Sequence, residues 1–165
     1  ITEHEMHAEF MEVTVELINT LLAQLPETIV CVGTTSLRSI ESLYWLGVKV
    51  ILVPTITITD LTVQQWDPYQ ENLVAIPVTV ALESLKNWMQ KNQLKTLLTK
   101  TQIIIAPGYS FKICNGLITN FHQPQSTLLL LVSALIGPNW KQVYQHALDN
   151  DFRFLSYGDG CLLWA

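Results

Sequence analysis

The sequence predicts an α/β domain with a mixed, largely parallel sheet and flanking helices. Short apolar runs that end at glycine or proline alternate with segments whose apolar residues recur at helical spacing. The 165 residues are enough for one domain with a hydrophobic core. Hydrophobic residues make up 49% and charged residues only 14% of the chain. We therefore expect other protein, from a longer chain or an oligomer, to cover much of its surface.

The first predicted elements are a strand, a helix and a second strand. Residues 2–13, "TEHEMHAEFMEV", alternate well enough to form a strand. Thr14 is a suitable N-cap for a helix with apolar residues at helical spacing, which Pro26 ends. Residues 28–33, "TIVCVG", form a short apolar run that is typical of a buried strand.

A second helix, a third strand and an irregular stretch are expected next. Ser36 is a suitable N-cap for the helix, and Gly47 stands where a helix commonly ends. Residues 48–53 then predict an apolar strand. "TITIT" at 55–59 alternates as an edge strand does, and "DLTVQQWDPYQEN" at 60–72 is typical of a loop.

Helices and strands continue to alternate toward the C-terminus. Residues 79–93 predict an amphipathic helix, and "TQIIIA" at 101–106 a buried strand. Residues 111–119 are the hairpin partner or the successor of that strand. The remaining expectations are a helix over 126–136, a helix over 139–151, and a last strand over 152–164 with a turn at 158–160.

Charge and cysteine content exclude some classes of protein. The net charge of −5 is not that of a stand-alone nucleic-acid binder. Cys31, Cys114 and Cys161 are far apart in sequence and form no CxxC pair, so neither a zinc site nor a disulfide framework is expected. Free thiols suit the cytoplasm. The chain starts at Ile1 without a signal-peptide pattern, so we expect the native N-terminus to lie upstream.

The segment "VGTTSLRS" predicts an anion or carboxylate site. A strand, a turn at Gly33 and a helix N-terminus bring free backbone N–H groups together. Thr34, Thr35 and Ser36 add hydroxyl donors, and Arg38 adds a planar fork that matches a carboxylate or phosphate. The alternative is an ordinary capped turn.

The segment "HEMHAE" offers an acid–base pair. On a strand, His7 and Glu9 share one face, whereas His4 and His7 lie on opposite faces. A metal site is therefore not favoured. The alternative is a solvated polar strand.

Two further segments combine polar or aromatic groups with turns. In "APGYSF", Tyr109 and Phe111 would alternate outward, as stacking on a flat ring requires; the alternative is that they belong to the core. In "TNFHQPQSTLLLLVSA", Asn120 and His122 precede a buried helix that Ser126 can cap, beside the positive end of its dipole.

The C-terminal segment "FRFLSYGDG" places Asp159 between two glycines. Such glycines permit either close backbone approach to a ligand or a plain hairpin turn. Arg153 lies in this segment. It and Arg38 are the only arginines of the chain, and both fall within motifs.

These segments, in this order, resemble the S-adenosylmethionine:tRNA ribosyltransferase-isomerase family of queuosine synthesis. The likeness covers the chain except residues 55–100, and "TNFHQPQSTLLLLVSA" and "YGD" are its most specific parts. It corresponds to the C-terminal half of a family member. The chain would then be a single α/β domain fragment over 1–165, with 55–100 as a variable insertion. The family's upstream half, including an inserted β-barrel, would lie outside it.

The resemblance implies a reaction and a set of residues. The family transfers the ribosyl part of S-adenosylmethionine to 7-aminomethyl-7-deazaguanine in tRNA, giving epoxyqueuosine and releasing adenine and methionine. S-adenosylmethionine is the substrate, and no cofactor, metal or membrane is involved. The resemblance implies proton transfer by His7 and Glu9, with His122 and Asp159 as rivals. The expected substrate-binding residues are Gly33, Thr34, Thr35, Ser36, Arg38, Tyr109, Phe111, Asn120, Ser126, Arg153 and Tyr157.

Some residues depart from the family pattern. Gly160 stands where the family usually has alanine, and Leu155 where it usually has phenylalanine. The segment "QQWDPYQE" within 55–100 matches no general family motif. Two alternatives remain open: a non-catalytic paralogue that binds S-adenosylmethionine or adenosine, and a small-molecule transferase that has lost tRNA. A basic face elsewhere in the protein would favour the tRNA enzyme.

Overall fold

The structure is a computed structural model that describes residues 6–25, 27–70 and 75–165. It divides into two compact units. The first comprises Ile1–Glu27 and Arg38–Ile103, and the second comprises Thr28–Leu37 and Ile104–Ala165. The expectation of a single domain with an insertion at 55–100 stays a prediction.

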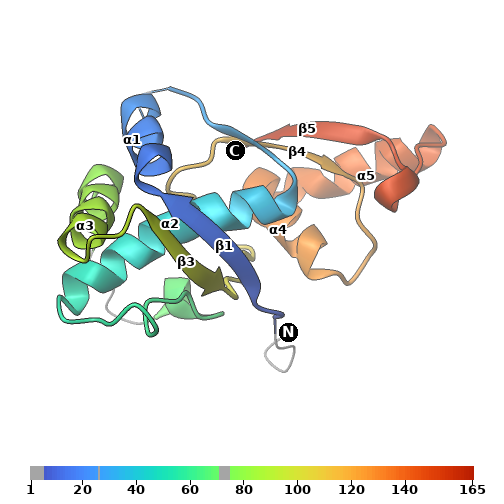
Figure 1. Cartoon of the computed structure of the whole chain (residues 1–165). Helices are drawn as coiled ribbons and strands as arrows, with labels where there is room; N and C mark the ends of the chain where they lie inside the picture. Colours follow the sequence, from blue (N-terminus) through green and yellow to red (C-terminus); the bar gives the residue numbers. More distant parts are fainter. Residues whose placement is uncertain (1–5, 26, 71–74) are drawn as a thin grey trace. The chain divides into compact units, whose positions relative to one another are not determined.

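The first unit combines an antiparallel strand pair with α-helices (Figure 1). Strand β1 (Glu9–Thr14) pairs with β3 (Thr96–Thr101), and α1 (Val15–Gln24) contacts α3 (Val78–Lys91). Most of α2 (Thr34–Leu52) belongs to this unit, as does the 3₁₀ turn η1 (Asp67–Tyr69). The Ser42 hydroxyl of α2 lies 2.8 Å from the Thr101 hydroxyl, so α2 packs against the β1–β3 pair.

The second unit contains a three-stranded mixed sheet. Strand β2 (Val30–Val32) runs parallel to β4 (Gly116–Asn120), which runs antiparallel to β5 (Gly160–Trp164). Parallel pairing between strands is confined to β2 and β4 in the described part of the chain. The other elements are α4 (Thr127–Ile136), α5 (Trp140–Asp149), η2 (Gly137–Asn139) and η3 (Leu155–Tyr157). The predicted α/β class with a mixed sheet is confirmed.

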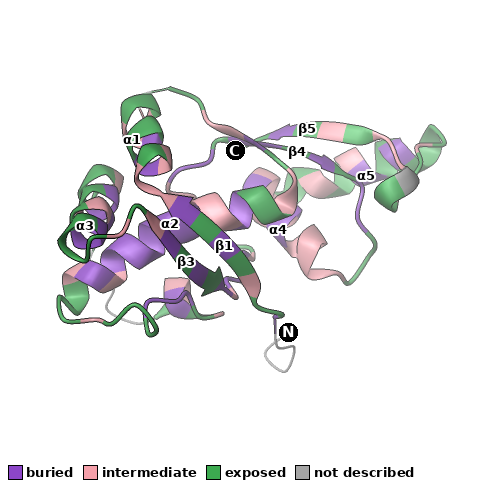
Figure 2. Ribbon diagram, in the orientation of Figure 1, coloured by how far each residue is buried: buried purple, intermediate pink, exposed green. Residues whose placement is uncertain are grey.

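Helix α2 differs most from the prediction. Every residue from Glu41 to Val48 is buried (Figure 2), so this stretch of the helix has no exposed face that would mark it as helical. It continues through Gly47 to Leu52, and the predicted strand at 48–53 is therefore wrong. A Cβ at Gly47 would lie 2.1 Å from the carbonyl oxygen of Ala81. Gly47 is thus not a helix end but the point where α3 approaches α2 closely.

The N-terminal cap of α2 was also mispredicted. The helix begins at Thr34, two residues before the expected N-cap Ser36. Gly33, whose φ is +89°, makes the turn from β2 into the helix. By contrast, the side chains of Thr14 and Ser126 accept hydrogen bonds from Leu17 N–H and Leu129 N–H, which confirms the N-caps of α1 and α4.

Several strands lie elsewhere than expected. The strand predicted at 101–106 is wrong in position, because β3 ends at Thr101 and the buried residues 103–105 are not in a strand. The edge strand predicted at 55–59 is instead a turn region, where the Thr57 hydroxyl donates to the Asp60 carboxylate at 2.5 Å. The other shifts are from 2–13 to Glu9–Thr14, from 111–119 to Gly116–Asn120, and from 152–164 to Gly160–Trp164.

Candidate functional site

The buried ion pair between Arg38 and Glu9 is the centre of the candidate site in the first unit. Arg38 lies in α2 and is 4% exposed. Its Nη1 contacts Oε1 of Glu9, at the start of β1, and its Nε–H donates to the carbonyl oxygen of Ile103 at 3.0 Å. Burial lowers the pKa of Arg38, and the Glu9 carboxylate acts in the opposite direction. The ion pair and the hydrogen bond to Ile103 therefore fix the guanidinium in one orientation.

Each member of this pair retains one buried atom without a hydrogen-bond partner among the described residues. These atoms are Oε2 of Glu9, an acceptor, and Nη2 of Arg38, a donor. A buried polar atom without a partner costs roughly 1–3 kcal/mol, and more when it carries charge. A hydroxyl can donate to the first of these atoms or accept from the second. The pair therefore has the chemistry of a polar binding site.

His7 lies next to this pair in sequence but not on the strand. It is exposed and precedes β1, whose first residue is Glu9. The prediction that His7 and Glu9 share one strand face is wrong, because strand pairing with β3 starts only at Glu9. His4, from the same motif, lies outside the described residues.

The "GTTS" turn has the geometry of a helix N-terminus. Gly33 N–H donates to Ile118 O at 2.8 Å, which fixes the turn to β4. The first helical residue, Thr34, is half-buried, and Thr35 and Ser36 are exposed. These hydroxyls and the first N–H groups of α2 are therefore accessible donors. Arg38, which was expected to act with them, is engaged by Glu9 and Ile103.

Tyr109 and Phe111 contact each other instead of pointing outward together. Their ring centroids are 5.2 Å apart at an interplanar angle of 83°. Tyr109 is buried and Phe111 is half-buried. The turn before them is closed by Tyr109 N–H, which donates to Ala106 O at 2.9 Å. The expectation of two outward rings is wrong for Tyr109, and Phe111 keeps partial access.

His122 is held inside the second unit by two uncharged hydroxyl groups. Its Nε2 lies 2.9 Å from the Thr119 hydroxyl, and its backbone N–H donates to the Tyr144 hydroxyl at 3.0 Å. Burial lowers the pKa of His122, which favours the neutral ring. Asn120 is exposed and donates from Nδ2 to Gly158 O at 3.4 Å. The sequence pattern did not reveal Tyr144, which comes from α5.

Arg153 and Asp159 pair with each other and close the loop between them. Arg153 Nη2 lies 3.0 Å from Asp159 Oδ1, and Arg153 N–H donates to Asp159 Oδ2 at 2.9 Å. These hydrogen bonds lower the pKa of Asp159. A Cβ at Gly158 would lie 2.3 Å from Arg153 O, so this glycine permits approach by the protein's own backbone. The alternative prediction of a plain hairpin turn around Asp159 is also wrong, because the strand after this turn, β5, pairs with β4. The side chain of Tyr157 is outside the described part.

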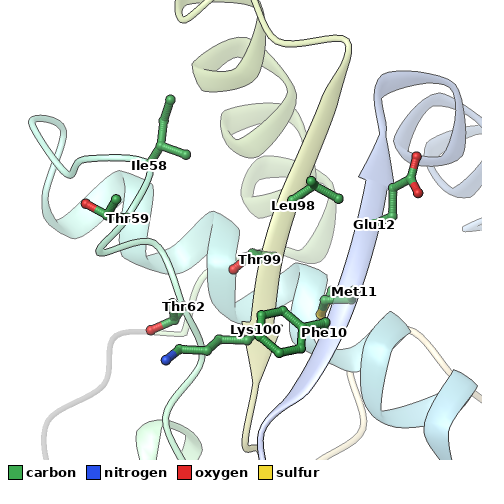
Figure 3. Close-up of a pocket in the computed structure, with 9 residues that line it drawn as sticks. All are labelled: Phe10, Met11, Glu12, Ile58, Thr59, Thr62, Leu98, Thr99 and Lys100. Carbon is green, nitrogen blue, oxygen red and sulfur yellow. The ribbon is translucent and has the colours of Figure 1, made fainter.

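A cavity of about 690 Å³ lies on the other face of the β1–β3 pair (Figure 3). Phe10 and Glu12 line it, whereas Glu9 and the buried Val13, on the alternate face of β1, do not. Phe10 is 88% exposed. Because none of the predicted site residues lines this cavity, the ion pair and not the cavity is the stronger candidate for chemistry. The remaining lining residues are Met11, Ile58, Thr59, Thr62, Leu98, Thr99 and Lys100.

The described part of the chain shows no metal site. It holds no group of three or more His, Cys, Asp or Glu side chains placed to bind a metal ion. None of its helices is both long and apolar enough to cross a membrane. Cys31 and Cys114, distant in sequence, are both buried, and their Sγ atoms lie 3.2 Å apart.

Comparison with known proteins gives consistent matches. A family model described as "Queuosine biosynthesis protein" matches residues 1–163. Proteins named S-adenosylmethionine:tRNA ribosyltransferase-isomerase from Legionella pneumophila strains Corby and Lens are 50% identical over 93 residues, which are 56% of this chain and 28% of theirs. The crystal structure of S-adenosylmethionine tRNA ribosyltransferase from Thermotoga maritima matches with a TM-score of 0.57 and 27% identity, covering 93% of this chain and 39% of that one. The chain thus spans less than a third of the length of these curated relatives.

Proposed function

The chain belongs to the queuosine biosynthesis protein family, and we propose that the protein is an S-adenosylmethionine-dependent tRNA ribosyltransferase-isomerase. It moves the ribosyl moiety of S-adenosylmethionine onto 7-aminomethyl-7-deazaguanine in tRNA to give epoxyqueuosine, and it releases adenine and methionine. S-adenosylmethionine is a substrate and no further cofactor takes part. The reaction takes place in the cytoplasm. The names of the relatives support this proposal.

The observation that carries the proposal is the Glu9–Arg38 pair with its two unpartnered atoms. The ribosyl group offers hydroxyls that can donate to Glu9 Oε2 or accept from Arg38 Nη2. Glu9 contacts Arg38 through Oε1, which leaves Oε2 as the atom that can accept a hydrogen bond from the substrate. We therefore assign substrate orientation to Glu9 and Arg38.

Exposed His7 is the better base for the proton next to the sulfonium. A neutral imidazole has a ring nitrogen that can accept a proton, and an exposed ring can reach a substrate. The rivals are weaker, since His122 is buried and Asp159 is engaged by Arg153. The exposed hydroxyls of Thr35 and Ser36 suit the methionine carboxylate or a tRNA phosphate. Other proposed substrate contacts are Gly33, Thr34, Phe111, Asn120, Ser126 and Tyr157.

The test uses the complete protein, because the chain spans 28% of the relatives' length. Adenine release from S-adenosylmethionine is measured by chromatography with two tRNAs, one carrying 7-aminomethyl-7-deazaguanine and one carrying guanine at that position. Release only with the first tRNA is the expected result. Tight binding of S-adenosylmethionine without release would instead identify a non-catalytic binding paralogue. Transfer to a small molecule but not to tRNA would identify the third class of function.

The catalytic role of His7 has its own test. Replacing His7 by alanine removes the proposed base, and the turnover number is expected to fall by at least about 100-fold, as is common for a lost general base. Turnover within about threefold of the wild type would exclude His7 as the base.

A further inference from the structure

Two glutamine side chains hold the backbone of Met6, the residue before His7. The Met6 N–H donates to Gln65 Oε1 at 2.8 Å. The Met6 carbonyl oxygen accepts from Gln102 Nε2, also at 2.8 Å. Gln65 lies 59 positions and Gln102 96 positions away along the chain. The Met6 side chain is buried, so the residue is held by packing as well as by both of its peptide groups.

The backbone fixes which end of each amide faces Met6. An N–H group only donates and a carbonyl oxygen only accepts. Gln65 therefore presents its oxygen to Met6, and Gln102 presents its nitrogen. Each glutamine makes one hydrogen bond to Met6, Gln65 as the acceptor and Gln102 as the donor. Different substitutions can therefore test the two bonds separately.

The segment that carries Gln65 is itself anchored to the end of β3. Val63 N–H donates to Lys100 O at 3.1 Å, and Gln102 N–H donates to Val63 O at 2.9 Å. The two glutamines are thus attached to one short bridge between the 61–70 segment and the β3 end.

A buried aspartate then fixes the turn that follows Gln65. Asp67 is 7% exposed and forms an ion pair with Lys49 at 2.6 Å. It also accepts from Gln64 N–H at 2.6 Å and from Gln70 Nε2 at 3.2 Å. The segment "QQWDPYQE" therefore contains a rigid support for Gln65, although it matched no general family motif.

We propose that Gln65 and Gln102 are positioning residues, which hold Met6 and thereby set the place of His7 and Glu9 during ribosyl transfer. This inference rests on the proposed function. His7 lies between Met6, which the glutamines hold, and Glu9, where pairing of β1 with β3 begins. An exposed side chain on so short a segment takes its position from the two fixed ends. Displacing a catalytic group by about 1 Å can lower the rate by about 100-fold.

The test places the same residue at both positions in the complete protein. Gln65→Glu keeps an acceptor for Met6 N–H, whereas Gln102→Glu sets a carboxylate against the Met6 carbonyl oxygen. We expect Gln65→Glu to keep kcat for adenine release within about threefold. We expect Gln102→Glu to lower it by at least about tenfold, with the KM for S-adenosylmethionine unchanged. Gln65→Met, which has no acceptor, should lose activity that Gln65→Glu retains.

Gln70→Met is the matched control. Gln70 lines the same small pocket as Gln65 and Gln102, but its amide contacts Asp67. Asp67 keeps its bonds to Lys49 and Gln64 in this variant. Wild-type kcat is expected.

Hydrogen exchange separates positioning from a general loss of folding. In Gln65→Met, the Met6 amide should exchange faster while Tm stays at the wild-type value. Faster exchange with wild-type kcat would overturn the inference, as would equal activity of the two glutamate variants. A kcat loss that follows only a lowered Tm would also overturn it. A wild-type protein that releases no adenine would remove the proposed function, and the inference with it.

Discussion

The two arginines of the chain form ion pairs in opposite surroundings. In the Arg38–Glu9 pair, the side chains are 5% and 30% exposed, and Arg38 also bonds to the Ile103 carbonyl. In the Arg153–Asp159 pair they are 71% and 38% exposed, and the partners are six residues apart on one loop. The first pair joins distant segments and leaves two polar atoms without partners among the residues that the structure describes. The second closes a local turn.

The difference shows why pairing alone does not identify a functional arginine. An exposed pair is solvated and screened, so little is lost when it opens. A buried pair has a desolvation cost that pairing only partly offsets, so leaving two of its atoms unpartnered is unfavourable unless a ligand uses them. If burial separates the two pairs, substitutions of Arg38 change stability and activity far more than substitutions of Arg153 do.

The largest effect is expected from Arg38→Met, which leaves the Glu9 carboxylate without its partner. Removing one member of a buried pair costs about 3–5 kcal/mol, and the lower end applies here because Glu9 is 30% exposed. We expect the free energy of unfolding in urea to fall by about 3 kcal/mol, and adenine release to be lost.

The matched control is the double variant Arg38→Met/Glu9→Gln. It removes both charges, so it should be more stable than Arg38→Met alone. A double variant as unstable as the sum of the single changes would show that the two side chains do not interact.

A smaller effect is expected from Arg38→Lys, which keeps the charge. Lysine has no Nε–H group in the position that donates to Ile103 O, and it lacks the planar fork. The lost hydrogen bond predicts a decrease of about 1–2 kcal/mol in the free energy of unfolding. If the two unpartnered atoms bind a substrate hydroxyl, the free-energy loss calculated from kcat/KM should exceed the loss in the free energy of unfolding. Wild-type kcat/KM in this variant would contradict the assignment of Arg38 to the substrate.

Local signals in the sequence predicted part of this fold correctly. Thr14 and Ser126 each accept a hydrogen bond from the backbone N–H three positions later in the chain. Because both partners are close in sequence, the local sequence is enough to predict these two N-caps. Gly47 could not be interpreted in this way, because a glycine is needed there to make room for the backbone of Ala81 in another helix. The apolar run at 48–53 has no periodicity that separates a buried helix from a buried strand.

The candidate site shows the same limit. The motifs pointed to Glu9 and Arg38 as separate groups, and the structure joins them. The contacts of Gln65 and Gln102 with Met6 depend on a bridge between Val63 and Thr101, and neither residue type nor spacing signals it.

His122 is buried without an ion pair, so the pH dependence of stability should show the effect of burial alone. Its folded-state pKa is lowered by burial, and its bonding partners, Thr119 and Tyr144, are uncharged. The unfolded chain therefore binds the proton more tightly, and stability rises with pH through this range. The penalty appears as pH falls below the ordinary histidine value of about 6.5. We expect His122→Gln to reduce the loss of Tm between about pH 7.5 and about pH 5.5. An unchanged pH dependence would contradict this account.

The smallest effect is expected from Arg153→Ala. Both partners reach solvent, and at 1 M salt the screening length is only about 3 Å. The pKa of Asp159 is lowered, so its contribution is present above its unfolded pKa and is lost only as pH falls through the folded one. At neutral pH, Tm should therefore change no more than repeated wild-type measurements do, at low and at high salt. A clear loss of Tm would show that burial does not separate the two arginines. A loss of adenine release at unchanged Tm would have a different meaning: the exposed guanidinium would contact substrate, and the loop that Asp159 closes would serve to present it.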